Sequence, residues 1–161
     1  GTTEIYNFDG PAEFEGLNLK SNIKGQLEVM KMEDSLNCKV SNIDTSVELI
    51  CDLCLKKFTE SIHIEIDERQ YHFYKPEVID DPNDIFLVNI KKQEIDLTEP
   101  LRQEIILHFP ELPVCYKSCK GICHICGIDK NKKSCDCKDE LPEEHKPLSA
   151  LKSLLKKNNN G

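Results

Sequence analysis

The chain has 161 residues, which is enough for one ordinary domain with a modest extension and too few for two full-sized globular domains. Its 29 acidic and 21 basic residues give a formal net charge of −8, which disfavours a protein that grips phosphate backbones along an extended face. No apolar run approaches the roughly 18 residues of a transmembrane helix, and the first residues lack the basic and apolar stretches of a secretion signal. We therefore expect a cytoplasmic location. Because the chain begins with Gly and not Met, the plastid stroma is the alternative if a transit peptide has been removed.

The charges are unevenly distributed along the chain. Residues 60–99 carry a net charge of −7, whereas residues 111–161 carry +3. An acidic body of this kind favours a basic partner. The Lys-rich end is the one part of the chain with a cationic excess.

Residues 21–74 alternate apolar and polar side chains with the period of half-buried strands. Turn-rich segments separate the strands at hairpin-like distances, so an antiparallel sheet or a partial barrel is predicted. The acidic, proline-containing segment 75–85 has no such period and is predicted to be a surface loop. The clearest inward-facing residues are Leu36, Cys38 and Val40 in one strand and Ile62, Ile64 and Ile66 in another.

A helix is predicted over residues 96–109. Asp96 or Thr98 can cap it, and Pro100 falls in the first turn, where N–H groups have no helical partner. Pro110 prevents the helix from continuing. Leu97, Leu101, Ile105 and His108 follow one another at the i+4 and i+3 spacings of one helix face, and His108, near the helix end, is read as a surface polar residue.

The chain contains nine cysteines, an odd number, and several have the C-x-x-C spacing of metal ligands. Cys38 lies on the inward face of a strand, where a free thiol acts as a small apolar side chain. Without a secretion signal, metal binding is favoured over disulfides for the rest. These eight form four close pairs, enough for two tetrahedral sites: Cys51 and Cys54, Cys115 and Cys119, Cys123 and Cys126, and Cys135 and Cys137.

The spacing favours one way of combining the pairs but leaves others open. Gly127 follows the third pair, as in a metal-binding knuckle, and the fourth pair lies close enough to complete its site. The first and second pairs would then form another site that joins a hairpin to the end of the helix. A rival combination joins Cys115 and Cys119 with Cys123 and Cys126, and spacing alone does not choose between them.

The metal that suits four thiolates is Zn(II), and closed all-sulfur sites are characteristically structural. We expect one or two structural zinc ions. One zinc held by four thiolates has a charge of about −2, which would reduce the +3 of residues 111–161 to about +1. His124 is the one histidine considered as a substitute ligand.

Catalytic function is not expected. The sequence has no phosphate-binding loop, dinucleotide glycine fingerprint or metalloprotease motif. A redox role for Cys51 and Cys54 is disfavoured because strand-like sequence lies on both sides of the pair, and a thioredoxin-like pair lies where a strand enters a helix.

These patterns predict an α+β protein in three parts. Residues 1–110 form the β-rich body that carries the helix, and residues 111–140 form a Cys-rich zinc-binding module. Residues 141–161 form a tail with a short amphipathic helix, which begins at Pro147. The apolar stripe of this terminal helix consists of Leu148, Leu151 and Leu155.

The order of four segments resembles the YceD family, the large ribosomal RNA subunit accumulation proteins of bacteria and plastids. The segments are ELICDLCLKKF, EIDLTEPLRQEIILHFPELPVC, CKGICHICGIDKN with CDC, and KPLSALKSLL, and the resemblance extends over residues 20–157. The eight paired cysteines match the cysteine-rich form of the family. The chain departs from the family pattern after the knuckle, where Lys130 stands in place of the usual Leu. Some relatives lack most of the C-terminal cysteines, which implies that the second site has a supporting role.

The resemblance implies a non-enzymatic factor that supports 23S rRNA accumulation and large ribosomal subunit biogenesis. Its partners would be a large-subunit ribosomal protein, 23S rRNA or both, with RNA contacts confined to the Lys-rich end. The alternatives are a zinc-ribbon interaction module unrelated to ribosomes and, less favoured, a thiol redox protein. No membrane or small-molecule substrate is expected.

Overall fold

The computed structural model describes residues 2–75 and 85–137, which belong to two compact units, Gly1–Cys119 and Lys120–Gly161. The described strands and helix all lie in the first unit. The boundary falls after Cys119, so the second cysteine pair belongs to the first unit. The predicted terminal helix and residues 76–84 of the predicted loop lie outside the described residues. None of the helices in the described ranges has the length and hydropathy needed to cross a bilayer.

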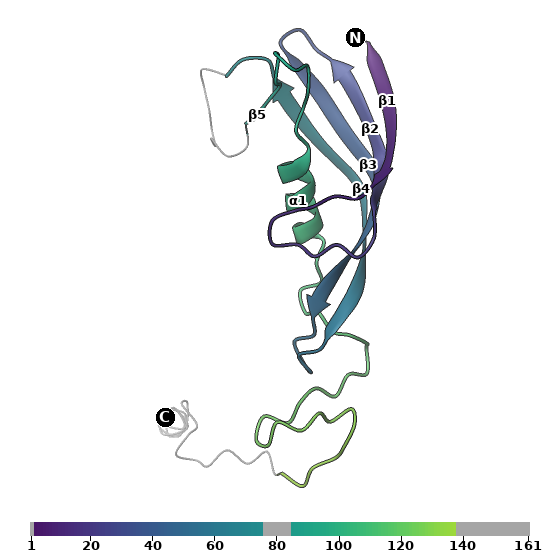
Figure 1. Ribbon diagram of the computed structural model, residues 1–161, viewed down its shortest axis with the longest axis vertical. Coiled ribbons are helices and arrows are strands. Elements are labelled where there is room, and N and C mark those ends of the chain that lie inside the picture. Colours follow the sequence, from purple (N-terminus) through teal and green to yellow (C-terminus); the bar gives the residue numbers. More distant parts are fainter. Residues whose placement is uncertain (1, 76–84, 138–161) are drawn as a thin grey trace, which may run out of the picture. The chain divides into compact units, whose positions relative to one another are not determined.

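A five-stranded sheet is the framework of the first unit (Figure 1). Strands β1 to β4 pair antiparallel, and the two-residue β5 pairs parallel to the end of β4. The α+β class is confirmed, and the antiparallel pairing that the sequence predicts holds for β1 to β4, while the short β5 adds a parallel pairing at the edge. Within the described ranges no pairing closes the sheet into a barrel. In spatial order the strands are β1 (Thr3–Gly10), β2 (Ile23–Lys31), β3 (Ser35–Ile50), β4 (Lys57–His72) and β5 (Phe86–Leu87).

Strand β1 was not predicted, although its sequence carries a short alternating signal. Tyr6 and Phe8 lie on the same face of the sheet, and Tyr6 pairs with Leu27 of β2. Phe8 pairs with Gly25, and a Cβ at that glycine would come within 2.6 Å of the Phe8 ring. The glycine therefore lets an aromatic ring lie directly over the neighbouring strand.

Part-way along β3 and β4, the side chains that face the core change from one set of alternate residues to the other. Asn42 has a φ of 51°, and the β2–β3 register shifts at the same place, as expected for a β-bulge. Beyond the bulge the side-chain alternation changes phase. Ile64 is therefore buried while Ile66 is 51% exposed, and Asp67 takes an inward position. The prediction that Ile66 faces the core is wrong for this reason.

Helix α1 (Thr98–Leu107) packs against β4 and completes the core. The N-cap residue is Leu97, which has no capping side chain, and the Asp96 carboxylate just before it accepts a hydrogen bond of 2.8 Å from the Thr98 backbone N–H. His108, near the end of the helix, is exposed, and its ring nitrogen Nδ1 bonds to the Glu104 carbonyl. The buried cluster beneath the helix consists of Phe14, Ile23, Val40, Ile43, Val47, Ile62, Ile64, Leu101 and Ile105.

An ion network joins α1 to β4 beside this cluster. The Arg69 guanidinium donates to Glu104 Oε1 at 2.7 Å, and its Nε lies 3.2 Å from Asp67 Oδ1. Burial raises the pKa of Asp67, and the positive charge of Arg69 opposes that effect. The positive charge of Arg69 thus offsets the negative charges of two carboxylates that are largely removed from water, Asp67 on β4 and Glu104 on α1.

We expect Arg69→Met to lower the free energy of unfolding by about 2 kcal/mol, because it leaves Asp67 and Glu104 shielded without a cation. Urea unfolding measures the change. The control is Lys24→Met, which removes an exposed contact of 3.9 Å to Asp9 and should change stability little. Equal losses in the two variants would contradict this role of Arg69.

Candidate metal centres

The first cysteine pair lies at the turn between β3 and β4. The Cys51 N–H donates to the Lys56 carbonyl at 2.8 Å, and the Leu55 N–H donates to the Cys51 carbonyl at 2.8 Å. These two bonds close a tight turn that contains Cys51 and Cys54. Both cysteines are buried although they lie at the end of a hairpin.

The second pair follows α1 and lies on this turn. The Asp52 N–H donates to the Pro113 carbonyl at 2.9 Å, and this bond joins the turn to the segment after the helix. The Cys119 N–H donates to the Tyr116 carbonyl at 3.0 Å, which shapes a second turn around the x3 spacing of Cys115 and Cys119. Two segments about 60 residues apart in the sequence thus meet at one point.

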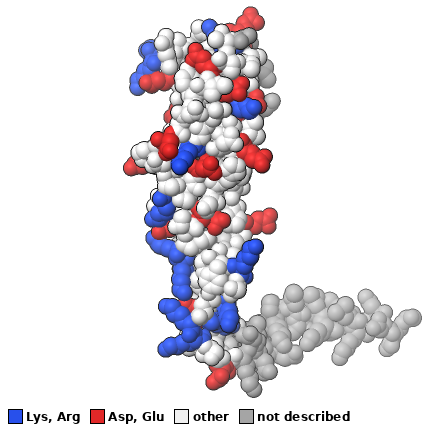
Figure 2. Space-filling view, turned by 90° about the vertical axis from the view of Figure 1, so that its right-hand side faces the viewer, with Lys and Arg blue, Asp and Glu red and all other residues white. Residues whose placement is uncertain are grey.

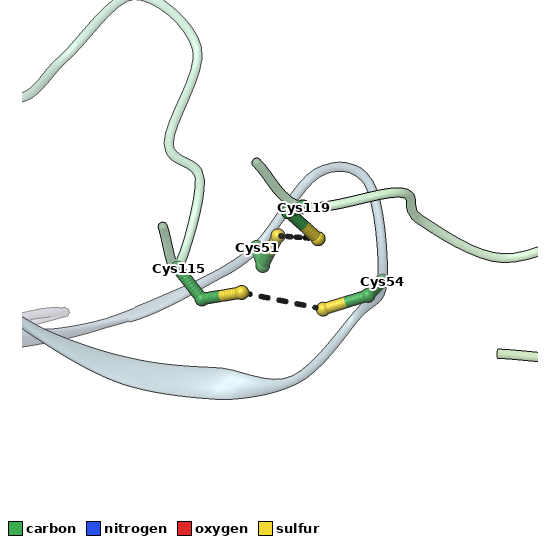
Figure 3. A group of neighbouring side chains, drawn as sticks. All are labelled: Cys51, Cys54, Cys115 and Cys119. Carbon is green, nitrogen blue, oxygen red and sulfur yellow. Dashed lines mark hydrogen bonds between the residues drawn. The ribbon is translucent and has the colours of Figure 1, made fainter. Parts of the chain in front are cut away.

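The four sulfur atoms of this first group point toward one another (Figure 3). They all lie within 4.8 Å of one another, with 3.9 Å between Cys51 and Cys119 and 3.6 Å between Cys54 and Cys115. A tetrahedral zinc site with bonds of about 2.3 Å requires sulfur separations of about 3.8 Å. The arrangement therefore fits a four-coordinate metal ion.

The protonation of these thiols also indicates a place for a cation. Burial raises the pKa of Cys51, but backbone N–H groups of Cys115, Cys54 and Leu53 outweigh it and lower the pKa to about 6. Burial and the neighbouring sulfurs raise the pKa of Cys115 to about 12. Four adjacent sulfurs cannot all ionise without a compensating positive charge, which a bound metal ion would supply.

A second four-cysteine group lies in the second unit. Its sulfur atoms also lie within 4.8 Å of one another. Backbone N–H groups of Cys126 and Ile125 lower the pKa of Cys123 to about 6, against the effect of burial. The members of the group are Cys123, Cys126, Cys135 and Cys137.

The two C-x-x-C turns have the same backbone structure. The Cys123 N–H donates to the Ile128 carbonyl and the Gly127 N–H to the Cys123 carbonyl, both at 2.8 Å, which repeats the two bonds around Cys51. The residue after the second cysteine has a left-handed backbone in both turns, with φ of 73° at Gly127 and 59° at Leu55. Glycine adopts this conformation without strain, whereas leucine does not.

Two polar residues that sequence reasoning did not single out organise the second unit. Asn131 Oδ1 accepts a bond of 2.8 Å from the Lys120 N–H, and the Asn131 N–H donates to Asp129 Oδ1 at 2.9 Å. These bonds hold the loop between the knuckle and the last two cysteines. The D-x-N pattern is typical of turn-forming side chains and could have indicated this role.

The structure brings the eight paired cysteines together in the combination that spacing favoured, and not in the rival one. Cys38 is buried outside both groups, and burial raises its pKa to about 11. His124 is exposed and belongs to neither group. Across the described ranges, no disulfide joins any of the nine cysteines. Of the lysines described between Cys115 and Cys137, Lys130 is partly buried and the exposed ones are Lys117, Lys120, Lys132 and Lys133.

The fold and the two groups define a small α+β protein whose loops can be held by two four-sulfur metal sites. Residues 40–155 match the family described as "Large ribosomal RNA subunit accumulation protein YceD". The chain belongs to this family.

Two curated proteins are similar to part of the chain. One is the chloroplastic YCED homolog 1 of Arabidopsis thaliana, named a large ribosomal RNA subunit accumulation protein, which is 33% identical over 64 residues. The homolog of the same name in Zea mays is 38% identical over 65 residues. The matches cover 39% and 40% of this chain and only 20% and 21% of those proteins. No solved structure matches the chain.

The left-handed backbone of Leu55 predicts how two substitutions at this position should rank in stability. Leu55→Val should lower the free energy of unfolding by about 1 kcal/mol, because a β-branched residue is more strained at positive φ. Leu55→Gly should cause no loss, since relief of strain offsets the greater freedom of the unfolded chain. Urea unfolding at a fixed metal concentration measures both variants. The reverse order would contradict the assigned backbone conformation.

Proposed function

We propose that this protein is a non-enzymatic factor that supports the accumulation of 23S rRNA and the biogenesis of the large ribosomal subunit. The family match over residues 40–155 carries the proposal, because it includes both four-cysteine groups. The similar proteins of Arabidopsis thaliana and Zea mays are named for large ribosomal RNA subunit accumulation. Because they are also named chloroplastic, the plastid stroma is the location we favour over the cytoplasm.

We further propose that each four-cysteine group holds one structural Zn(II) ion. Four sulfurs supply all the ligands of a tetrahedral zinc, which leaves no open position for a reacting water or substrate. Among the described histidines, none belongs to either group. Zinc at these sites would stabilise the fold by joining loop segments that have few apolar residues of their own.

Elemental analysis of the purified protein should find two zinc ions per chain. Cys54→Ser and Cys126→Ser should each lower the content to about one, because each removes a ligand from a different group. Cys38→Ala is the matched control and should retain two, since Cys38 lies outside both groups. A content that falls equally in all three variants would overturn the assignment of ligands.

The partner that the charges favour is a basic protein. Residues 1–119 carry a net charge of −11, whereas residues 120–161 carry +3 before the thiolates of the second group are counted. Long-range attraction would therefore bring a basic large-subunit ribosomal protein to the first unit, and any RNA contact would involve the second unit. Tight binding of bare 23S rRNA fragments, with a steep salt dependence and no protein present, would contradict this arrangement.

Depletion of the protein from cells tests the ribosomal role directly. The ratio of 23S to 16S rRNA should fall, and expression of the unaltered chain should restore it. Rescue by Cys38→Ala but not by Cys54→Ser would connect the role to the first four-cysteine group. An unchanged ratio after complete depletion would contradict the proposal and favour an interaction module unrelated to ribosomes.

A further inference from the structure

An apolar groove lies on the inner face of the sheet, and none of its lining residues belongs to either four-cysteine group. Its volume is about 500 Å³, within the range of about 300–1,000 Å³ typical of binding pockets. One wall is formed by the first three strands, and the other by a loop in which Asn89 and Glu94 exchange two backbone hydrogen bonds of 2.8 and 3.3 Å. The apolar lining consists of Tyr6, Leu27, Val29, Leu36, Phe73, Val88, Ile90 and Ile95.

Strand β1 forms the rim of this groove and, among the described strands, one edge of the sheet, with no described strand paired to its outer side (Figure 1). The Lys31 N–H donates to the Thr2 carbonyl, so Thr2 and every second residue after it point their backbone groups toward β2. The residues between them present N–H and C=O groups to the open edge, and these are Thr3, Ile5, Asn7 and Asp9. β1 contains neither Lys nor Pro, the residues that commonly protect an edge from pairing.

The charge of the edge distinguishes among the strands that could pair with it. β1 carries Glu4 and Asp9 and no basic residue. Two copies of β1 side by side would bring four carboxylates together, which opposes pairing between identical chains. The Tyr6 hydroxyl donates to Glu4, and Glu4 also lines a smaller depression beside the groove. Figure 2, which faces the β1 side of the sheet, shows acidic and basic side chains scattered among broad uncharged areas.

We propose that β1 is a docking edge for an extended basic segment of a partner protein. The segment adds a strand to β1 through the backbone groups of Thr3, Ile5, Asn7 and Asp9. Its inward apolar side chain lies beside Tyr6 at the mouth of the groove, and its basic side chains, on the opposite face of the sheet, lie near Asp9. The choice of a basic protein segment rests on the proposed function and names the surface that contacts that partner.

The test uses the full chain and a fluorescent ten-residue peptide in which Lys alternates with Val. Fluorescence anisotropy at low salt should show binding at least about tenfold tighter than for the same peptide with Glu in place of Lys. Hydrogen exchange should slow at the amides of Thr3, Ile5, Asn7 and Asp9 when the Lys peptide binds. Equal binding of the Glu peptide, or no slowing at these amides, would overturn the proposal.

The matched variants are Ile5→Pro and Ile5→Ala. The proline removes a backbone N–H that faces the open edge and not β2, so the β1–β2 pairing survives. Ile5→Pro should weaken peptide binding by about tenfold, whereas Ile5→Ala should change it by less than about twofold. Glu4→Lys, which leaves the backbone intact, should also weaken binding. Unchanged binding in both Ile5→Pro and Glu4→Lys would contradict strand addition.

Two further outcomes would assign the edge to another occupant. Protection of the same amides by a ten-nucleotide RNA, without binding of the Lys peptide, would assign it to nucleic acid. Protection that rises with protein concentration alone would assign it to a second copy of the chain. Either result would overturn this inference and leave the effect of depletion on 23S rRNA untouched, so the two proposals can fail separately.

Discussion

The approach of Cys115 and Cys119 to Cys51 and Cys54 is the contact on which the far end of the first unit depends. The β3–β4 hairpin extends past the apolar cluster under α1, and Ile50 at its end is 54% exposed. Little apolar burial therefore holds the turn. One backbone bond, from Asp52 to Pro113, and four converging sulfurs connect it to the segment after the helix. A metal ion at this point would close a loop of about 60 residues and order both segments together.

Both four-cysteine groups bring two of their sulfur atoms together with the same local backbone structure. Each C-x-x-C turn has the same pair of backbone bonds and the same left-handed residue after its second cysteine. N–H groups within each turn, with one from Cys115 at the first group, lower the pKa of the first cysteine of the turn, which favours its thiolate, the form that binds a metal ion. Leu55 adopts with strain the left-handed backbone that Gly127 adopts without strain. The shared turn structure therefore follows from the spacing of the cysteines more than from the identity of the residue after them.

The sequence predicts those features that local spacing determines. Leu101 and Ile105 have the period of a helix face, and the cysteine pairs have the spacing of metal ligands, so both predictions agree with the structure. The burial of Asp67 in place of Ile66 could not be predicted in this way, because it depends on a bulge at Asn42 that exists only when β3 pairs with β2. β1 was missed because its alternation is short and its pairing partner lies some 20 residues away.

Hydrogen exchange with and without bound zinc tests the central claim, that the first four-cysteine group holds the hairpin end and the segment after α1 together. The amides of residues 49–57 and 113–119 should exchange at least about tenfold faster after a chelator removes the metal. Those of Ile43, Val47 and Ile105, in the apolar cluster, should change little. Equal exchange of residues 113–119 in the two states would contradict the claim, because this segment would then be just as ordered without the metal as with it.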